Sequence, residues 1–156
     1  MILLHPYVPG HRPADQCPTW EALSQLDMLG IDEVRHVPCT GPSNYAWALR
    51  DLVDAGEDVI VVEQDIVPTQ EQWTDLRWCR KSFCAADYLV EAGVLWSRIP
   101  GGFGLGLAKI SADAYVQIVE TPQVPLVHWR DLAGVMRERL GPPHLHAGPV
   151  QHNHQY

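Results

Sequence analysis

The hydrophobic pattern is strongest at residues 59–62, where four β-branched residues, Val-Ile-Val-Val, form an unbroken apolar run. Such a run predicts a strand that is buried on both faces, as in the interior of a parallel sheet. Glu63 and Asp65 follow directly, and Pro68 comes three residues after the second acid. Open α/β sheets bind ligands at the carboxyl ends of their strands, so these acids are the first candidates for a site. The alternative is an acidic strand end with no ligand.

The remaining pattern predicts strands that alternate with helices in the first half of the chain. Apolar or alternating segments indicate strands at residues 2–4 and 33–38, with an extended proline-rich loop at residues 5–18. Capping residues and helical spacing indicate helices at residues 20–29, 44–53, 111–119 and 129–140, and another that begins at Thr69. Residues 88–90 and 94–96 resemble a short hairpin. We therefore expect one α/β domain over residues 1–156, with a mostly parallel central sheet flanked by helices and a small mixed-strand C-terminal extension.

Composition and charge narrow the classes of function. The 156 residues are 46% hydrophobic, which is enough to build a buried core in one domain. The net charge is −8 and the 11 Lys and Arg residues are scattered, which argues against non-specific binding of nucleic acid. No apolar run approaches the roughly 20 residues that span a bilayer, and the first residues lack the basic segment of a signal peptide. We expect a soluble, cytoplasmic protein.

The cysteine pattern points to the same compartment. Cys17, Cys39, Cys79 and Cys84 form neither a Cys-x-x-Cys pair nor the short regular spacing of a disulfide scaffold. A chain with an ample core does not need disulfides for stability. We therefore expect four free thiols, buried or half-buried, as in a reducing compartment.

Histidines are concentrated in the last part of the chain, where they offer further metal ligands. His144 and His146 alternate as on a strand, and so do His152 and His154. Acids two residues apart on an extended chain also point to one side. Carboxylates together with imidazoles suit Mn²⁺ or a similar divalent ion, whereas Mg²⁺ prefers oxygen ligands alone. The alternative is a frayed terminal segment.

Two further segments carry candidate chemistry. Gly101, Gly102 and Gly104 belong to a glycine cluster, where a backbone can pass close to a ligand. The cluster does not match the Gly-x-Gly-x-x-Gly fingerprint, so we do not expect a Rossmann dinucleotide site, and a plain turn is the alternative. Asp131 begins the last predicted helix, either as a first-turn acid near the helix dipole or as a general base.

The order of these features resembles that of GT-A type glycosyltransferases: an acid-x-acid strand exit, a glycine-rich loop, an acid at a helix start and a near-terminal histidine. Residues 44–68 carry the clearest match, to the family's helix, strand and DxD-like motif. The resemblance implies that Glu63 and Asp65, with His152 or His154, bind Mn²⁺ (or Mg²⁺) on the diphosphate of a nucleotide-sugar. It makes Asp131 the catalytic base. The nucleotide-sugar-binding residues would be His5, Pro6, Tyr7, Glu63, Gln64, Asp65, Gly101, Gly102 and Gly104.

The chain departs from the family's pattern in three respects. The first acid of the motif is Glu63 rather than Asp, and Cys39-Thr40-Gly41 occupies the place of the nucleoside-binding Asp. The base of a UDP- or GDP-sugar would then contact residues 5–12 and 39–45. The chain is also short, and so resembles the minimal versions found among small phage and actinobacterial enzymes.

Two other classes of function would use the same residues. A metal-dependent phosphate enzyme, such as a nucleotidyltransferase or pyrophosphohydrolase, needs the acids but transfers no sugar. A non-catalytic nucleotide-sugar-binding module would keep the scaffold without turnover. The sequence leaves open the donor, the acceptor (a protein or a glycan) and the stereochemistry, because only an inverting transfer requires the base.

Overall fold

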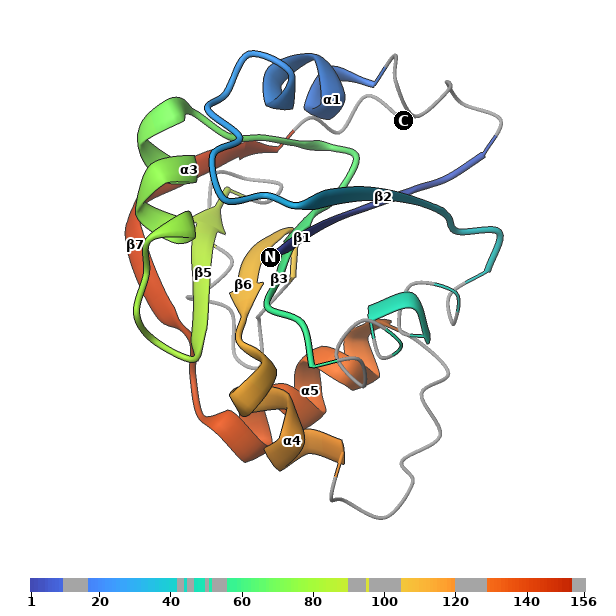
Figure 1. The fold of residues 1–156 in the computed structure, drawn as a ribbon, viewed down its shortest axis with the longest axis vertical. Helices are drawn as coiled ribbons and strands as arrows, with labels where there is room; N and C mark the ends of the chain where they lie inside the picture. The colour runs from blue at the N-terminus through green and yellow to red at the C-terminus, as the bar shows by residue number, and fades with distance from the viewer. Residues whose placement is uncertain are drawn as a thin grey trace.

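A seven-stranded sheet forms the centre of the protein, in the order β2-β1-β3-β6-β5-β7-β4 (Figure 1). The computed structural model describes residues 1–9, 17–41, 44, 47–49, 51, 56–89, 95, 105–119 and 129–152, with most of their side chains. The strands are β1 (Ile2–Tyr7), β2 (Glu33–Pro38), β3 (Val59–Val62), β4 (Ile66–Val67), β5 (Phe83–Tyr88), β6 (Leu107–Ile110) and β7 (His144–His152). The helices are α1 (Pro18–Leu23), α3 (Gln70–Arg77), α4 (Ala112–Val119) and α5 (Trp129–Leu140), and residues 44, 47–49 and 51 are also helical.

Most strands run in one direction, as the sequence predicts. Strands β2 and β3 both pair with β1 in parallel, and β7 pairs with β5 in parallel. Strand β6 is antiparallel to β3 and to β5, so it lies in the middle of the sheet and not in a terminal extension. The short β4 is antiparallel to β7. The mostly parallel α/β class is therefore confirmed, and β6, one of the two reversed strands, lies in an unexpected place.

Helices cover both faces of the sheet because alternate residues of its central strands point to opposite sides. On one face, Leu3, Ile60 and Val62 pack with residues of α1 and α3. On the other face, Leu4 and Val61 pack with residues of α4 and α5. All four residues of β3 are fully buried, which confirms the strand predicted from the apolar run.

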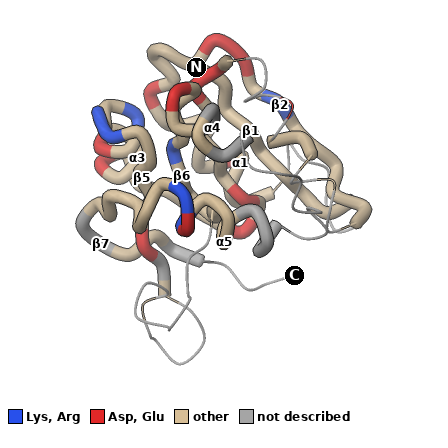
Figure 2. Tube along the Cα trace, turned by 90° about the horizontal axis from the view of Figure 1, so that it is seen from below, with Lys and Arg blue, Asp and Glu red and all other residues tan. Residues whose placement is uncertain are grey.

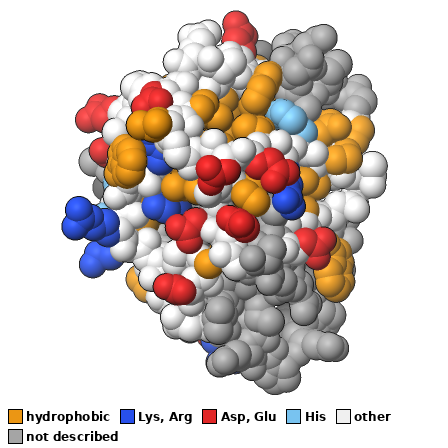
Figure 3. Space-filling model, viewed as in Figure 1, with side chains coloured by type: hydrophobic (Ala, Val, Ile, Leu, Met, Phe, Trp, Pro, Cys, Tyr) orange, Lys and Arg blue, Asp and Glu red, His pale blue; other side chains and the backbone are white. Residues whose placement is uncertain are grey.

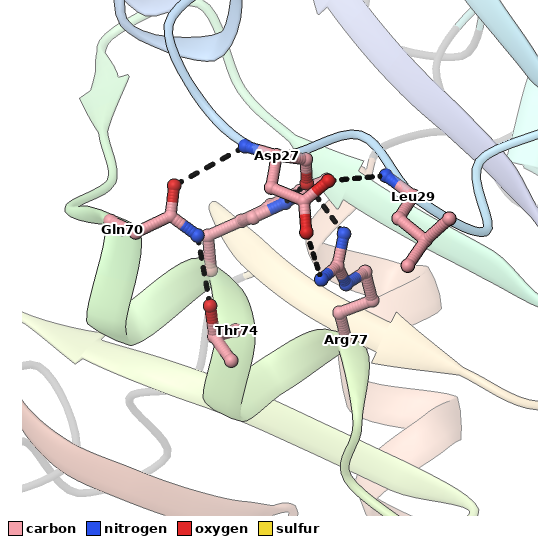
Figure 4. Close-up of polar contacts among 6 residues, drawn as sticks. Asp27, Leu29, Gln70, Thr74 and Arg77 are labelled. Carbon is pink, nitrogen blue, oxygen red and sulfur yellow. Dashed lines mark hydrogen bonds and ion pairs between the residues drawn. The ribbon is translucent and has the colours of Figure 1, made fainter.

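The chain after α1 is attached to α3 through Asp27 (Figure 4). The buried guanidinium of Arg77 donates to the carbonyl of Asp27 and, at 2.9 Å, to its carboxylate. The backbone N–H of Asp27 donates to Oε1 of Gln70 at 3.2 Å, and Asp27 Oδ1 accepts from the N–H of Leu29 at 2.9 Å. These bonds compete with helix continuation, so α1 ends at Leu23 rather than near residue 29. The predicted helix is therefore wrong in its second half.

Two strands are longer than the sequence predicts. β1 includes His5, Pro6 and Tyr7, which were expected to lie in a loop. Its described pairing beyond Leu4 is with β2 alone, and a proline fits a strand that has one open side. β5 begins at Phe83, five residues before the expected strand, and an antiparallel bridge between residues 89 and 95 is consistent with the predicted hairpin.

The expectation of four free thiols is wrong. Cys79 and Cys84 form a disulfide, with their Cα atoms 6.8 Å apart, whereas Cys17 and Cys39 are free. The pair joins the second residue after the end of α3 to the second residue of β5, and a separation of five residues lies outside the spacings used in the prediction. A reducing compartment therefore does not follow from the cysteines.

Positive charge is dispersed over the described part of the molecule, whereas acidic side chains gather on one face (Figure 2 and Figure 3). Lys and Arg lie at several separate places along the chain rather than in one stripe (Figure 2). Acidic side chains gather across the middle of the face seen in Figure 3, in keeping with the net charge of −8. None of the helices in the described ranges is long and apolar enough to cross a membrane.

Candidate functional site at the carboxyl ends of β1, β2 and β3

The carboxyl ends of the three parallel strands are joined by hydrogen bonds. The N–H of Cys39, just after β2, donates to the carbonyl of Tyr7 at 2.7 Å. The N–H of Val8, just after β1, donates to Oε1 of Gln64 at 2.6 Å. Gln64 belongs to the acid turn (residues 63–65) that follows β3, so its side chain attaches this turn to the end of β1. Tyr7 and Gln64, both predicted from sequence, therefore lie in one site.

The backbone of Glu63 is fixed from three sides. Its N–H donates to the carbonyl of Gly106 at 2.8 Å, and its carbonyl accepts from the N–H of Ile66 at 3.1 Å. The buried hydroxyl of Thr19, in α1, also donates to this carbonyl at 3.1 Å. The bond to Gly106 brings the end of the glycine-rich segment against the acid turn. Gly101, Gly102 and Gly104 themselves lie outside the described residues.

The carboxylate of Glu63 faces the interior of this site. The residue is half-buried and its Oε1 atom is buried. Burial, and secondarily the negative charge of Glu63, raises the pKa of Cys39 to about 11, so this thiol stays protonated at neutral pH. Asp65 is also half-buried. Among the described residues, no third side chain of His, Cys, Asp or Glu lies close enough to Glu63 and Asp65 to bind one metal ion together with them.

A pair of histidines lies near the carboxyl ends of β1 and β2. Nδ1 of the buried His5 is 2.9 Å from Nδ1 of His36, so one ring donates and the other accepts. Nε2 of His5 lies 3.4 Å from Sγ of Cys17, which also accepts from the N–H of Trp20 and so caps α1. Burial, followed by the charge of His36, lowers the pKa of His5 to about 4, and its imidazole is neutral at pH 7.

Aromatic rings extend from this pair toward the surface. The ring of Trp20 meets that of His36 edge-on, with centroids 4.6 Å apart, and the ring of Tyr7 is stacked 6.4 Å from that of His5. His36 is exposed, whereas Trp20 and Tyr7 are half-buried. The site thus has an aromatic side, which includes the neutral His5, in addition to its acidic side.

The histidine-rich segment is a strand that reaches the acid turn. In the pairing of β4 with β7, Ile66 lies opposite His152, so His152 lies across from the residue that follows Asp65. The side chain of Gln72 donates to the carbonyl of Pro149 at 3.0 Å and attaches β7 to α3. The prediction of a docked segment is confirmed for residues 144–152, and the frayed alternative is excluded there. The side chain of His152 and all of His154 lie outside what the structure describes.

Asp131 is the third residue of α5, which confirms its predicted place at a helix start. Its side chain is not among those described, so its role as a base stays a prediction. The fold places Pro6 in β1 opposite Val37 of β2, within the same strand end as His5 and Tyr7.

Cys17, Trp20 and His36 are site residues that the sequence analysis did not identify. The parallel register pairs His5 with His36, but this pairing joins residues 31 apart in the sequence. His36 lies in a predicted strand, but His5 is predicted to lie in the loop after one, so the sequence pattern does not pair them. The half-polar pattern of β2 otherwise resembles an ordinary exposed strand.

Comparison with known proteins extends the description of the fold. No protein-family model matches the chain, and no curated protein matches it. Among solved structures, the crystal structure of A197 from STIV is similar, with a TM-score of 0.58 and 12% sequence identity. The match covers 95% of this chain and 81% of that one. At this identity the similarity concerns the fold alone: nearly the whole chain follows an architecture that a solved protein also adopts.

Proposed function

We propose that the protein is a metal-dependent glycosyltransferase that moves a sugar from a nucleotide-sugar to a hydroxyl acceptor. The observation that carries the proposal is the position of Glu63, Gln64 and Asp65 at the carboxyl end of a buried strand. That turn is bonded to the ends of β1 and β6, and β7 brings His152 opposite the next residue. Ligands of open α/β sheets bind at this kind of edge.

The donor set fits a divalent ion such as Mn²⁺. Glu63 and Asp65 supply carboxylate oxygens and His152 supplies an imidazole, a combination that suits Mn²⁺ better than Mg²⁺. His154 is the alternative to His152. When bound, the ion neutralises the diphosphate leaving group as the glycosidic bond breaks.

The aromatic side of the site is suited to a nucleoside. His5 is neutral and held by His36, and with Tyr7 it forms an uncharged surface next to the acid turn. The rings of Trp20 and His36, in edge-to-face contact, lie at the same end. We assign the base of the donor to this side, with UDP and GDP as the candidates, and the diphosphate to the acidic side.

The remaining roles concern acceptor and sugar. Asp131 takes the proton of the acceptor hydroxyl if the transfer inverts the anomeric centre, whereas a retaining transfer does not use this base. Gly101, Gly102 and Gly104 supply backbone amides near the donor, since glycines permit close approach.

Calorimetry with Mn²⁺ on Asp65→Ala tests the proposal at its metal site. We expect affinity to fall at least about tenfold, or about 1.4 kcal/mol. Asp113→Asn, which changes an exposed acid in the first turn of α4, is the matched control and should bind normally. His152→Ala should resemble Asp65→Ala, and unchanged Mn²⁺ affinity in Asp65→Ala would refute the proposal.

Product analysis separates the proposal from its rivals. Incubation with UDP- and GDP-sugars and Mn²⁺ should give nucleoside diphosphate and a new glycosidic bond on a hydroxyl acceptor. A phosphate enzyme would instead release sugar phosphate, independently of the acceptor. A binding module would be stabilised by the nucleotide in thermal shift but would form no product. In each case EDTA should remove most of the nucleotide binding, because two acids repel a diphosphate when no cation lies between them.

A further inference from the structure

Three potential metal ligands converge away from the acid turn, on the side of the sheet covered by α3. Cys79 follows the end of α3, Cys84 lies in β5 and His146 lies in β7. The two sulfur atoms and a ring nitrogen of His146 all lie within 4.8 Å of one another. Cys84 is buried, and the other two are half-buried. Three separate elements therefore bring soft ligands together.

Their backbones are held independently of the disulfide. β5 and β7 are hydrogen-bonded in register, with Cys84 opposite His144 and residue 86 opposite His146. The buried ammonium of Lys109 donates to the carbonyl of Cys79 at 2.9 Å and to that of Arg77 at 2.8 Å. The three ligand residues would thus stay close together if the sulfur–sulfur bond were broken.

The imidazole of His146 has an unused ligand atom. Its Nε2 is buried and makes no hydrogen bond within the described residues. A buried polar atom normally has a partner, and this nitrogen is therefore available to bind a metal ion. The ring of His144 meets that of His146 edge-on, with centroids 5.0 Å apart, which places a second imidazole beside the cluster.

We propose that Cys79, Cys84 and His146 form a Zn²⁺-type metal site when the disulfide is reduced, and that the disulfide closes this site when it is oxidised. Two thiolates and an imidazole are ligands that tetrahedral Zn²⁺ prefers, and His144 is placed to supply the fourth. This donor set differs from the carboxylates of the acid turn, so the inference does not depend on the proposed glycosyltransferase function.

The redox step balances with simple reactants. A trialkylphosphine breaks the sulfur–sulfur bond, takes oxygen from water and leaves two thiols, so the disulfide is reduced and phosphorus is oxidised. The two thiols lose their protons to solvent as the metal binds. In the reverse direction, hydrogen peroxide oxidises the two thiolates to the disulfide, takes up two protons, forms two waters and releases the metal ion.

Titration with Co²⁺, a spectroscopic substitute for Zn²⁺, tests the site in an Asp65→Ala background, which weakens the other proposed metal site. After phosphine reduction and removal of the phosphine, we expect one Co²⁺ per chain with a thiolate-to-metal charge-transfer band in the near ultraviolet. The oxidised protein should show no such band. Absence of the band from the reduced protein would overturn the proposal.

Substitutions identify the ligands. Cys84→Ser should abolish the band or weaken binding at least about 100-fold, and His146→Ala should weaken it at least about tenfold. Cys39→Ser removes a thiol elsewhere and is the control. If Cys84→Ser fails to fold, Cys79→Ser at the half-buried position tests the same ligand pair. A band that is unchanged in either cysteine variant, or His146→Ala binding as tightly as the control, would also overturn the proposal.

Discussion

Acidification from pH 7 to pH 5 should destabilise the wild-type protein by about 2 kcal/mol through His5. The pKa of this buried histidine is lowered from 6.5 to about 4 in the folded state, by burial and then by His36. Between these values the unfolded chain binds a proton that the folded chain does not. Stability therefore falls as the pH drops through 6.5, and the loss is complete below about pH 4.

The magnitude follows from the pKa difference. Each pKa unit corresponds to about 1.4 kcal/mol, so the full shift would be worth about 3 kcal/mol. At pH 5 the histidine is mostly protonated in the unfolded chain, whereas His5 in the folded protein is mostly neutral. Somewhat more than half of the full loss of stability therefore occurs between pH 7 and pH 5. Because the side chain is fully buried, solvent screens the effect little.

Urea unfolding of the wild type and of His5→Gln at pH 7, 6 and 5 measures the contribution of His5 to the pH dependence of stability. Over this range, the free energy of unfolding of His5→Gln should fall by about 2 kcal/mol less than that of the wild type. The His5 ring protons should also show no titration by NMR above pH 5. Equal pH dependence of wild type and His5→Gln would refute the reasoning.

Two further predictions concern buried polar contacts on the α3 side of the sheet. Trp73→Phe should lower the free energy of unfolding by about 2 kcal/mol in urea titrations, because it removes a hydrogen bond to the carbonyl of Asp27 and leaves a cavity. The control Trp78→Phe changes a side chain that is 60% exposed and should alter this free energy by less than about 0.5 kcal/mol. Lys109→Met should cost about 2 kcal/mol in thermal and urea unfolding, because two carbonyls at the end of α3 lose their donor, and the exposed Lys81→Met is the control. A Lys109 variant as stable as its control would contradict the assigned contacts.

Sequence patterns predicted correctly those helices and strands whose ends are set by residues close by in the chain. The bounds of β2 and α5 agree with the sequence analysis, since alternation and a terminal glycine define them within a few residues. The acid turn was predicted for the same reason, from a buried strand followed by Glu63 and Asp65. α1 was predicted too long because the bonds that end it come from α3, and Arg77 is 50 residues away from Asp27.

Non-local pairing explains what the sequence analysis missed. β5 begins Phe-Cys-Ala-Ala, and its small residues Cys84 and Ala86 have little strand propensity but pack in the core on the side of α3. The partnership of His5 with His36 and the disulfide of Cys79 with Cys84 both depend on how strands and helices meet in space. In the site, the acids and the neighbouring His5 and Tyr7 were therefore predicted, whereas Trp20 and His36 were not.

The double pairing of β7 has a consequence for synthesis on the ribosome. Of the described strands, β7 is made last, yet β5 and β4 both need it as a hydrogen-bonding partner. Until it emerges, the nascent chain exposes an unpaired edge along β5, and the segment just after Asp65 has no described strand beside it. A growing chain is thus most prone to aggregation while residues 83–143 are outside the ribosome and residues 144–152 are still inside it. The acid turn acquires its neighbouring strand only when translation of this region is complete.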